Sequence, residues 1–492
     1  MRSVAAEHRA SSLGAEALLI LVARVLGAAS TSILTVVLAS RLGSERFGVY
    51  ALGLTIAATM GTFAELGIAS ALARFVAEAH PDRGRQRAIV RRGLTVKVGA
   101  GLVVALVMLA AAEPIAGLFG GHADQASVVR AAALAVLFSD LFGALSGLFV
   151  SLRFARANVI VNLTKSLVEL GLVVALVATS GIGPLGAVLA NAFGYGLGSL
   201  VGIALVARGT AGAAASSSAT AAVDLLRYAR LVWLANLPWV GFVTIDQLLL
   251  GAMLGPVAVG LYDAPLRINT LFQFVGMAAA AALAPRMVGG DAAVSRRPIF
   301  NRALRTTVAA YVALGLSIIP FADEAISVAL GPSFARSSGV LIAILPYVAL
   351  LGATPLMSMS LNMIGTRAAQ IWVGLATLAV NLGLDLVLIP AIGVTGPAIA
   401  TDIAFGLYFV GHLVLCDQTI GIDRRPLVRS VANGVLAGCG ALIVGLLLDR
   451  LDLGDWQTLV IGVIPAGATA IAILVLRREL DRSLIALLRH RS

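Results

Sequence analysis

The chain has 492 residues, of which 59% are hydrophobic and only 12% are charged. Soluble domains carry roughly a quarter charged residues, so this composition excludes an ordinary soluble protein and indicates a membrane protein. The formal net charge of +11 comes from arginines dispersed over many loops, whereas a nucleic-acid-binding protein gathers its basic residues in one patch.

Apolar windows of about 20 residues predict fourteen membrane-spanning helices. In chain order they cover residues 17–39, 47–72, 97–118, 128–150, 157–179, 183–206, 229–253, 260–285, 303–326, 338–364, 369–390, 395–416, 429–448 and 456–476. These runs are continuously apolar, whereas the strands of a membrane barrel alternate. We therefore predict an all-α, polytopic membrane protein.

Positive charges in the loops predict the orientation of these helices. With the amino terminus in the cytoplasm, 27 of the 36 Lys and Arg residues fall on the cytoplasmic side, five on the opposite side and four within spans. This bias predicts that both termini are cytoplasmic. The arginine-rich run 83–92 is interpreted as a solvated cytoplasmic loop that contacts anionic headgroups, and Lys97 is counted with that loop.

The two halves of the chain repeat each other at an offset of about 211 residues. Residues 42–50 (LGSERFGVY) return as 254–262 (LGPVAVGLY), and Gly120 returns as Gly331. Six spans per repeat is an even number, so both copies insert the same way up and form parallel repeats. We predict an amino-terminal six-helix lobe over 14–207, a cytoplasmic linker over 208–222, a carboxyl-terminal six-helix lobe over 223–416 and two additional helices over 429–476.

Sequence signatures of catalysis are absent. The chain has no P-loop, no H-E-x-x-H zinc motif, no Cys/His cluster and no G-x-S-x-G elbow. The predicted external loops are short and leave no room for an active site. We predict no enzymatic activity, no metal site and no cofactor.

Several motifs resemble the polysaccharide transport family. They are LG..RFG.Y near the end of the first span, ALARF at 71–75, the stretch 246–268, ALGPSF at 329–334 and the stretch 381–401. That family shares a superfamily with the multidrug and toxin extrusion antiporters and the lipid II flippases. The resemblance implies a flippase in the bacterial cytoplasmic (inner) membrane that translocates an undecaprenyl-diphosphate-linked oligosaccharide by alternating access. Implied partners are the lipid-linked glycan, membrane lipids, and a glycan polymerase and glycosyltransferases, with no nucleic acid.

Most charges predicted to lie deep in the spans break the internal repeat. At the repeat offset an uncharged residue replaces each of Arg24, Glu65, Asp140, Lys165, Asp246 and Arg267. An ionised side chain deep in a span costs at least about 2.5–3.5 kcal/mol and usually faces a cavity or a partner. Charges that the fold does not repeat are therefore better candidates for handling a substrate.

Three cations are candidates for binding the diphosphate, because guanidinium and ammonium groups make charge-assisted hydrogen bonds to phosphate oxygens. They are Arg24, Arg267 and Lys165. Each also has a structural interpretation. Arg24 is close enough to the cytoplasm to snorkel. Asp263 and Glu169 lie four residues from Arg267 and Lys165, where they can neutralise them within one helix.

Three acids, Asp246, Asp385 and Asp402, are candidates for binding a coupling ion or, alternatively, hydrogen-bond acceptors within a lobe. Two other functions stay open. The first is a cation-coupled multidrug exporter, which would favour an aromatic pocket. The aromatic content of only 6% argues against it. A non-transporting scaffold of a glycan-assembly complex is the other alternative.

Overall fold

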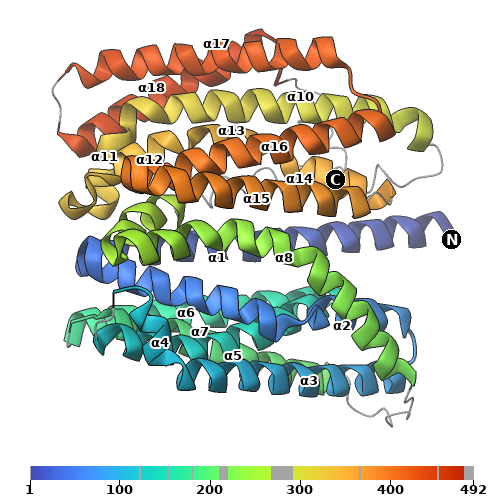
Figure 1. The fold of residues 1–492 in the computed structure, drawn as a ribbon. Helices are drawn as coiled ribbons and strands as arrows, with labels where there is room; N and C mark the ends of the chain where they lie inside the picture. Colours follow the sequence, from blue (N-terminus) through green and yellow to red (C-terminus); the bar gives the residue numbers. More distant parts are fainter. Residues whose placement is uncertain are drawn as a thin grey trace. The chain divides into compact units, whose positions relative to one another are not determined.

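The computed structural model describes residues 2–120, 123–152, 154–179, 181–209, 220–267, 292–364, 367–451 and 454–480, and the side chains of 2–26, 28, 123–124, 209, 220–224, 292–296 and 367 lie outside its description. Within these ranges the regular structure is helical (Figure 1). The predicted all-α membrane fold is thereby confirmed. The chain divides into two compact units, Met1–Gly260 and Leu261–Ser492.

Eight helices are labelled among the described residues of the first unit. They are α1 (Arg2–Glu65), α2 (Ile68–Glu78), α3 (Arg83–Ala110), α4 (Ala112–Gly117), α5 (Ala123–Ser151), α6 (Ala155–Thr179), α7 (Pro184–Gly209) and α8 (Thr220–Leu254). Helix α5 packs against α1, α2, α3 and α7, and α8 packs against α1 and α2. The apolar core around α5 includes Phe142, Leu145, Leu148 and Phe149.

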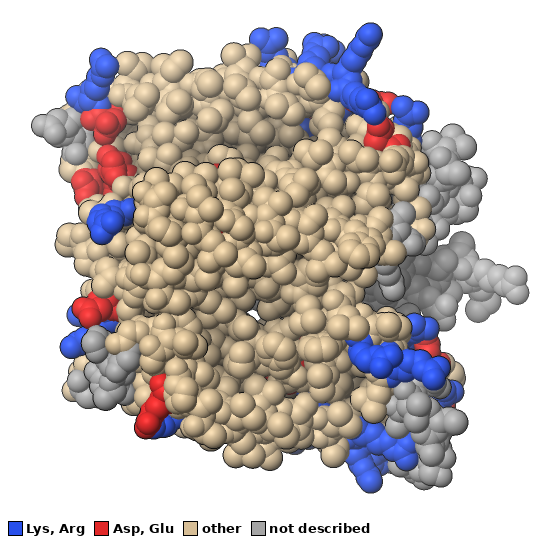
Figure 2. Space-filling model, in the orientation of Figure 1, with Lys and Arg blue, Asp and Glu red and all other residues tan. Residues whose placement is uncertain are grey.

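The second unit contains α10 (Ala292–Ile318), α11 (Ala322–Leu330), α12 (Ser337–Ala343), α13 (Leu345–Leu351), α14 (Thr354–Ile364), α15 (Arg367–Ile392), α16 (Gly396–Thr419), α17 (Arg424–Asp449) and α18 (Asp455–Leu476), with short 3₁₀ turns at Ile319–Phe321, Pro332–Phe334 and Gly393–Thr395. Helix α10 packs against α13 and α17, α15 against α16, and α17 against α18. On the face shown in Figure 2, charged side chains gather at the helix ends and the middle of the helices is uncharged.

Ten helical segments among the described residues are long and apolar enough to cross a membrane, or eleven if α13 and α14 together form one bent span. One of the ten, Ala368–Thr419, contains both α15 and α16. Most of the predicted eighth span, 260–285, lies outside the described residues. The count of fourteen therefore stays a prediction, as do the lobe boundaries and the linker, of which 210–219 is likewise not described.

Three predicted elements are corrected by the structure. The run 83–92 is not a loop but the first turns of α3, which Asp82 caps by accepting a hydrogen bond from the Arg85 amide at 2.9 Å. The span 338–364 is divided into α12, α13 and α14, with a bend of 41° between the last two. Pro346 and Pro355 stand at the second positions of α13 and α14, where a missing N–H is tolerated but the preceding helix cannot continue. The third correction, the break of the span 47–72, forms part of the site below.

Paired glycines of the repeat share positive φ angles. Gly43 (φ 70°) and Gly255 (φ 80°) are both left-handed, as are Gly120 (φ 108°) and Gly331 (φ 87°). The pair Gly48 and Gly260, both in the first unit, also packs reciprocally. A Cβ at Gly48 would lie 1.7 Å from the Pro256 carbonyl oxygen, and one at Gly260 would lie 2.1 Å from that of Ser44. Ser44 and Pro256 are themselves repeat equivalents, so the contact has the form that a local two-fold axis produces.

Candidate functional site

A break in the second predicted span forms the centre of the site. Helix α1 ends at Glu65 and α2 begins at Ile68, with Leu66 (φ 45°) and Gly67 (φ 71°) in the left-handed region between them. Only glycine fits at the second position, because a Cβ there would lie 2.0 Å from the Ala229 carbonyl oxygen of α8. A break inside a predicted span frees backbone carbonyls that lipid cannot satisfy.

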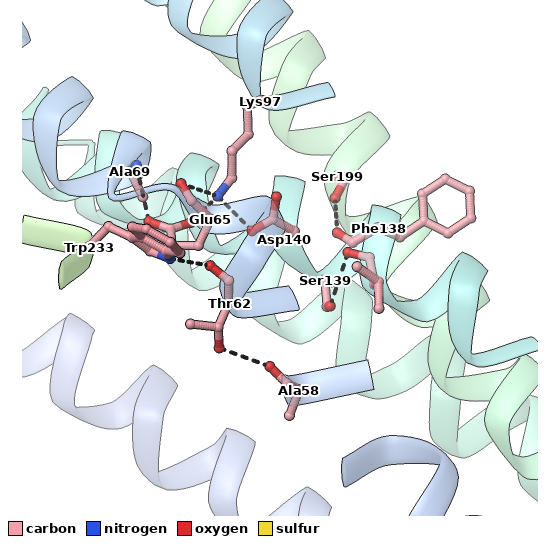
Figure 3. Close-up of polar contacts among 11 residues, drawn as sticks. Ala58, Thr62, Glu65, Ala69, Lys97, Phe138, Ser139, Asp140, Ser199 and Trp233 are labelled. Atoms are coloured by element: carbon pink, nitrogen blue, oxygen red, sulfur yellow. Dashed lines mark hydrogen bonds and ion pairs between the residues drawn. The ribbon is translucent and has the colours of Figure 1, made fainter. Parts of the chain in front are cut away.

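Side chains from two other helices satisfy these carbonyls (Figure 3). The Trp233 indole of α8 donates to the Thr62 carbonyl oxygen at 2.7 Å. The Lys97 ammonium of α3 lies 3.4 Å from the Glu65 carbonyl oxygen. A cation at the carboxyl end of α1 is also favoured by the helix dipole. On the other side of the break, the Glu65 carboxylate accepts from the Ala69 amide of α2 at 3.2 Å.

Lys97 joins two carboxylates from different helices into a charged triad. Its ammonium contacts the Glu65 carboxylate of α1 and lies 2.6 Å from Oδ1 of Asp140 on α5. The Lys97 side chain is fully buried, Asp140 is 5% exposed and Glu65 is 31% exposed. Fully ionised, the Glu65–Lys97–Asp140 triad carries a net charge of −1 in the interior of the first unit.

Lys97 was missed as a site residue by the sequence interpretation. It was counted with the arginine-rich loop, but α3 begins at Arg83, which places Lys97 fourteen residues and about 21 Å into the helix. A periodicity test on 83–97 would have found it, because Lys97 is buried whereas the preceding arginines are exposed. Glu65 and Asp140, by contrast, already stood out as charges that break the repeat.

A second polar cluster contains the predicted residue Lys165. Its ammonium lies 2.5 Å from the Glu169 carboxylate and 4.7 Å from the centre of the Tyr195 ring. Glu169 also accepts a hydrogen bond from the side-chain amide of Asn191 at 2.7 Å. The expected intrahelical pair is therefore present, and it is extended into a network between α6 and α7. As a diphosphate ligand, Lys165 stays a prediction.

The other two predicted cations differ in what the structure describes. Arg267 pairs with Asp263, four residues earlier, and both side chains are largely buried. This is the neutralising pair that the sequence spacing indicated. Arg24 belongs to α1, but its side chain lies outside the described residues, so its role stays a prediction.

The three predicted acids are all largely buried or hydrogen-bonded, and each is described within its own unit. Asp246 of α8, in the first unit, is 4% exposed. In the second unit, the carboxylate of Asp385 on α15 lies 3.4 Å from the side-chain amide nitrogen of Asn381. Asp402 of α16 accepts a hydrogen bond from the backbone amide of Tyr347 at 2.8 Å. It thereby caps the first turn of α13, which begins at Leu345. Asp402 thus has a structural role as an acceptor, and ion binding by these acids stays a prediction.

Arg74 of the ALARF motif, one of the four cations counted within the predicted spans, lies near the end of α2. Its guanidinium donates to Glu78 at 2.7 Å and lies 4.6 Å from the centre of the Tyr228 ring on α8. The hydrogen bond that Arg74 donates to Glu78, followed by its hydrogen bond with Tyr228, raises the pKa of Arg74 above its ordinary value. The side chain is half exposed, as expected for an arginine that snorkels at a helix end.

The described helices define the class, a multi-pass helical membrane protein whose chain divides into two compact units. The structure is similar to that of the lipid II flippase MurJ in an inward closed conformation, with a TM-score of 0.72 and 14% identity over 94% of this chain and 99% of MurJ. It is also similar to an inward-facing multidrug resistance MATE family transporter of the MOP superfamily, with a TM-score of 0.63 and 15% identity over 82% of this chain and 95% of that one.

The family model described as polysaccharide biosynthesis protein matches residues 13–289, and the chain belongs to that family. The expected resemblance is thereby confirmed. A similar curated protein is the probable flippase AglR of Haloferax volcanii, 27% identical over 270 residues. The match covers 53% of this chain and 56% of AglR, so it spans about half the length of either protein.

Proposed function

We propose that the protein is a flippase that moves a lipid-linked oligosaccharide across the cytoplasmic membrane for polysaccharide biosynthesis. Its membership of the polysaccharide biosynthesis family carries the proposal. The fold shared with a lipid II flippase over nearly the whole chain supports it, as does the sequence similarity to a probable flippase. The substrate that we infer is an undecaprenyl-diphosphate-linked oligosaccharide, and we infer no catalytic step.

The physical problem is to carry a diphosphate with about two negative charges, and the attached sugars, through a region without water. Arginine can replace the hydration of a diphosphate with bidentate hydrogen bonds. Arg267 suits this role because its guanidinium is largely buried, and it is held there by an ion pair with Asp263 on the same helix. A diphosphate would compete with Asp263 for the guanidinium and would be released when the pair re-forms. Arg24 and Lys165 are further candidates, and alternating access would expose the headgroup to each face in turn.

The test is translocation by the full-length protein reconstituted in liposomes. A fluorescent undecaprenyl-diphosphate oligosaccharide in the outer leaflet should become protected from a membrane-impermeant quencher when the protein is present. Arg267→Ala should reduce the translocation rate by about tenfold or more, because lost charge-assisted hydrogen bonds to a buried anion are worth about 1.5–3 kcal/mol. Arg336→Ala, an exposed arginine in the same unit, is the matched control.

Other outcomes would contradict the proposal. If the labelled glycan lipid stays in its leaflet while an organic cation dye accumulates, the protein is a drug exporter, as the MATE relatives allow. If neither moves, a non-transporting scaffold is favoured. An unchanged rate in Arg267→Ala together with a slow rate in Arg24→Ala would transfer the diphosphate site to Arg24.

Orientation is tested separately. We propose cytoplasmic termini, which places the arginine-rich start of α3 inside the cell and the end of α17 outside. In a background where Cys416 and Cys439, the free cysteines of the described residues, are replaced by serine, Arg450→Cys should react with an impermeant maleimide in intact cells. Arg85→Cys should react only after permeabilisation. Both arginines are exposed, so labelling of Arg85→Cys from outside would reverse the topology.

A further inference from the structure

The Glu65–Lys97–Asp140 triad has an unbalanced buried charge. Two carboxylates share one ammonium. Among the described side chains of α1 to α8, the other charged groups are exposed, apart from the Lys165–Glu169 pair of α6 and Asp246 of α8. Asp246 lies thirteen residues, about 20 Å along α8, from Trp233. The described surroundings of the triad therefore supply no second cation, and a buried excess charge is costly.

The two carboxylates are not equivalent. Both oxygens of Glu65 accept hydrogen bonds, one from the Ala69 amide and one from Lys97, and the side chain is 31% exposed. Asp140 is 5% exposed, and its Oδ2 is buried without a hydrogen-bond partner among the described residues. A Cβ built on Gly101, one turn beyond Lys97 on α3, would lie 3.9 Å from this oxygen. Asp140 is thus the carboxylate whose negative charge is less well satisfied.

We propose that the triad binds one exchangeable proton, with Asp140 as the acceptor and Glu65 as the route by which the proton arrives. Uptake of the proton on Oδ2 leaves Lys97 and Glu65 as a neutral pair and removes the excess charge. A proton fits better than a metal ion because Lys97 already occupies the position between the oxygens. The described residues also contain no group of three or more His, Cys, Asp or Glu that could hold a metal.

Proton occupancy would change how the helices around the break are held. In the ionised state Lys97 ties α3 to α5 through Asp140 and to the α1–α2 junction through Glu65. With Asp140 protonated, the Lys97 ammonium forms an ion pair with Glu65 alone. The junction contacts α8 directly, through Trp233 at Thr62 and through Gly67 at Ala229. Protonation of Asp140 would therefore bias the packing of α1, α2 and α8. On the proposed flippase function, this change in packing couples the uptake of a proton to transport.

Infrared difference spectroscopy of the full-length protein in lipid tests the proton site without reference to transport. Wild type should show the carbonyl band of a protonated carboxylic acid that disappears as pH rises. Asp140→Asn and Glu65→Gln should both lack this band, because each variant leaves a neutral pair with Lys97. Glu113→Gln, which alters an exposed pair with Arg130 in the same unit, should retain it. Absence of a titrating band in wild type, or its persistence in Asp140→Asn, would overturn the proposal.

Transport in the same liposomes tests the coupling. A gradient of about one pH unit should shift the wild-type distribution of the labelled glycan lipid by up to about tenfold for one coupled proton. Asp140→Asn should lose this response to pH. An equal response in both proteins would refute coupling through the triad. If wild type moves no glycan lipid but shows the titrating band, the flippase proposal fails and the proton site stands.

Discussion

Replacing Lys97 with methionine is expected to destabilise the protein severely. Methionine keeps the length of the side chain but removes the ammonium that holds Glu65 and Asp140 together. Breaking a buried ion pair by removing one partner costs about 3–5 kcal/mol, because the remaining charge stays buried without compensation. The freed Glu65 carbonyl oxygen at the end of α1 would also lose its contact with Lys97. The free energy of unfolding in detergent, followed by denaturant titration, should fall by this amount.

A rescue variant separates charge from packing. Lys97→Met combined with Glu65→Gln and Asp140→Asn has no buried charge in the triad, so it should recover a large part of the lost stability. Arg130→Met, which breaks the exposed pair with Glu113, should leave stability nearly unchanged. Wild-type stability in Lys97→Met would show that the triad is not a buried charge cluster.

The second large effect is expected at Gly48. Alanine there would place its Cβ 1.7 Å from the Pro256 carbonyl oxygen, and backbone atoms cannot withdraw as a flexible side chain can. Overpacking of this kind costs about 1–3 kcal/mol and occasionally more. Gly48→Ala should therefore lower both the unfolding temperature and the yield of monodisperse protein.

Gly61→Ala on the same helix is the matched control, because a Cβ there meets nothing within 4 Å. Removing a helical glycine should be neutral or stabilise the protein by up to about 1 kcal/mol. Equal behaviour of Gly48→Ala and Gly61→Ala would mean that the segments 44–48 and 256–260 do not pack closely. The reciprocal variant Gly260→Ala should resemble Gly48→Ala, because its Cβ would lie 2.1 Å from the Ser44 carbonyl oxygen.

The site was only partly predictable from the sequence. The pairs Lys165–Glu169 and Arg267–Asp263 follow from a spacing of four on a helix, which is a local property. Glu65 and Asp140 stood out because neither recurs in the second half of the chain. Lys97 could not be assigned to them, because 32 and 43 residues separate it from Glu65 and Asp140. Only the packing of α3 against α1 and α5 brings these three side chains together.

The sequence by itself determined that the chain is an α-helical membrane protein. The reason is that the free energies of transferring apolar side chains from water into lipid are nearly additive along a window of about 20 residues. It also determined the internal repeat, which reappears in the positive φ angles of Gly43 and Gly255. The tertiary structure decided where the helices break. A two-residue interruption such as Leu66–Gly67 is invisible to a long window, because it depends on α8 approaching the backbone and on Trp233 and Lys97 satisfying the freed carbonyls.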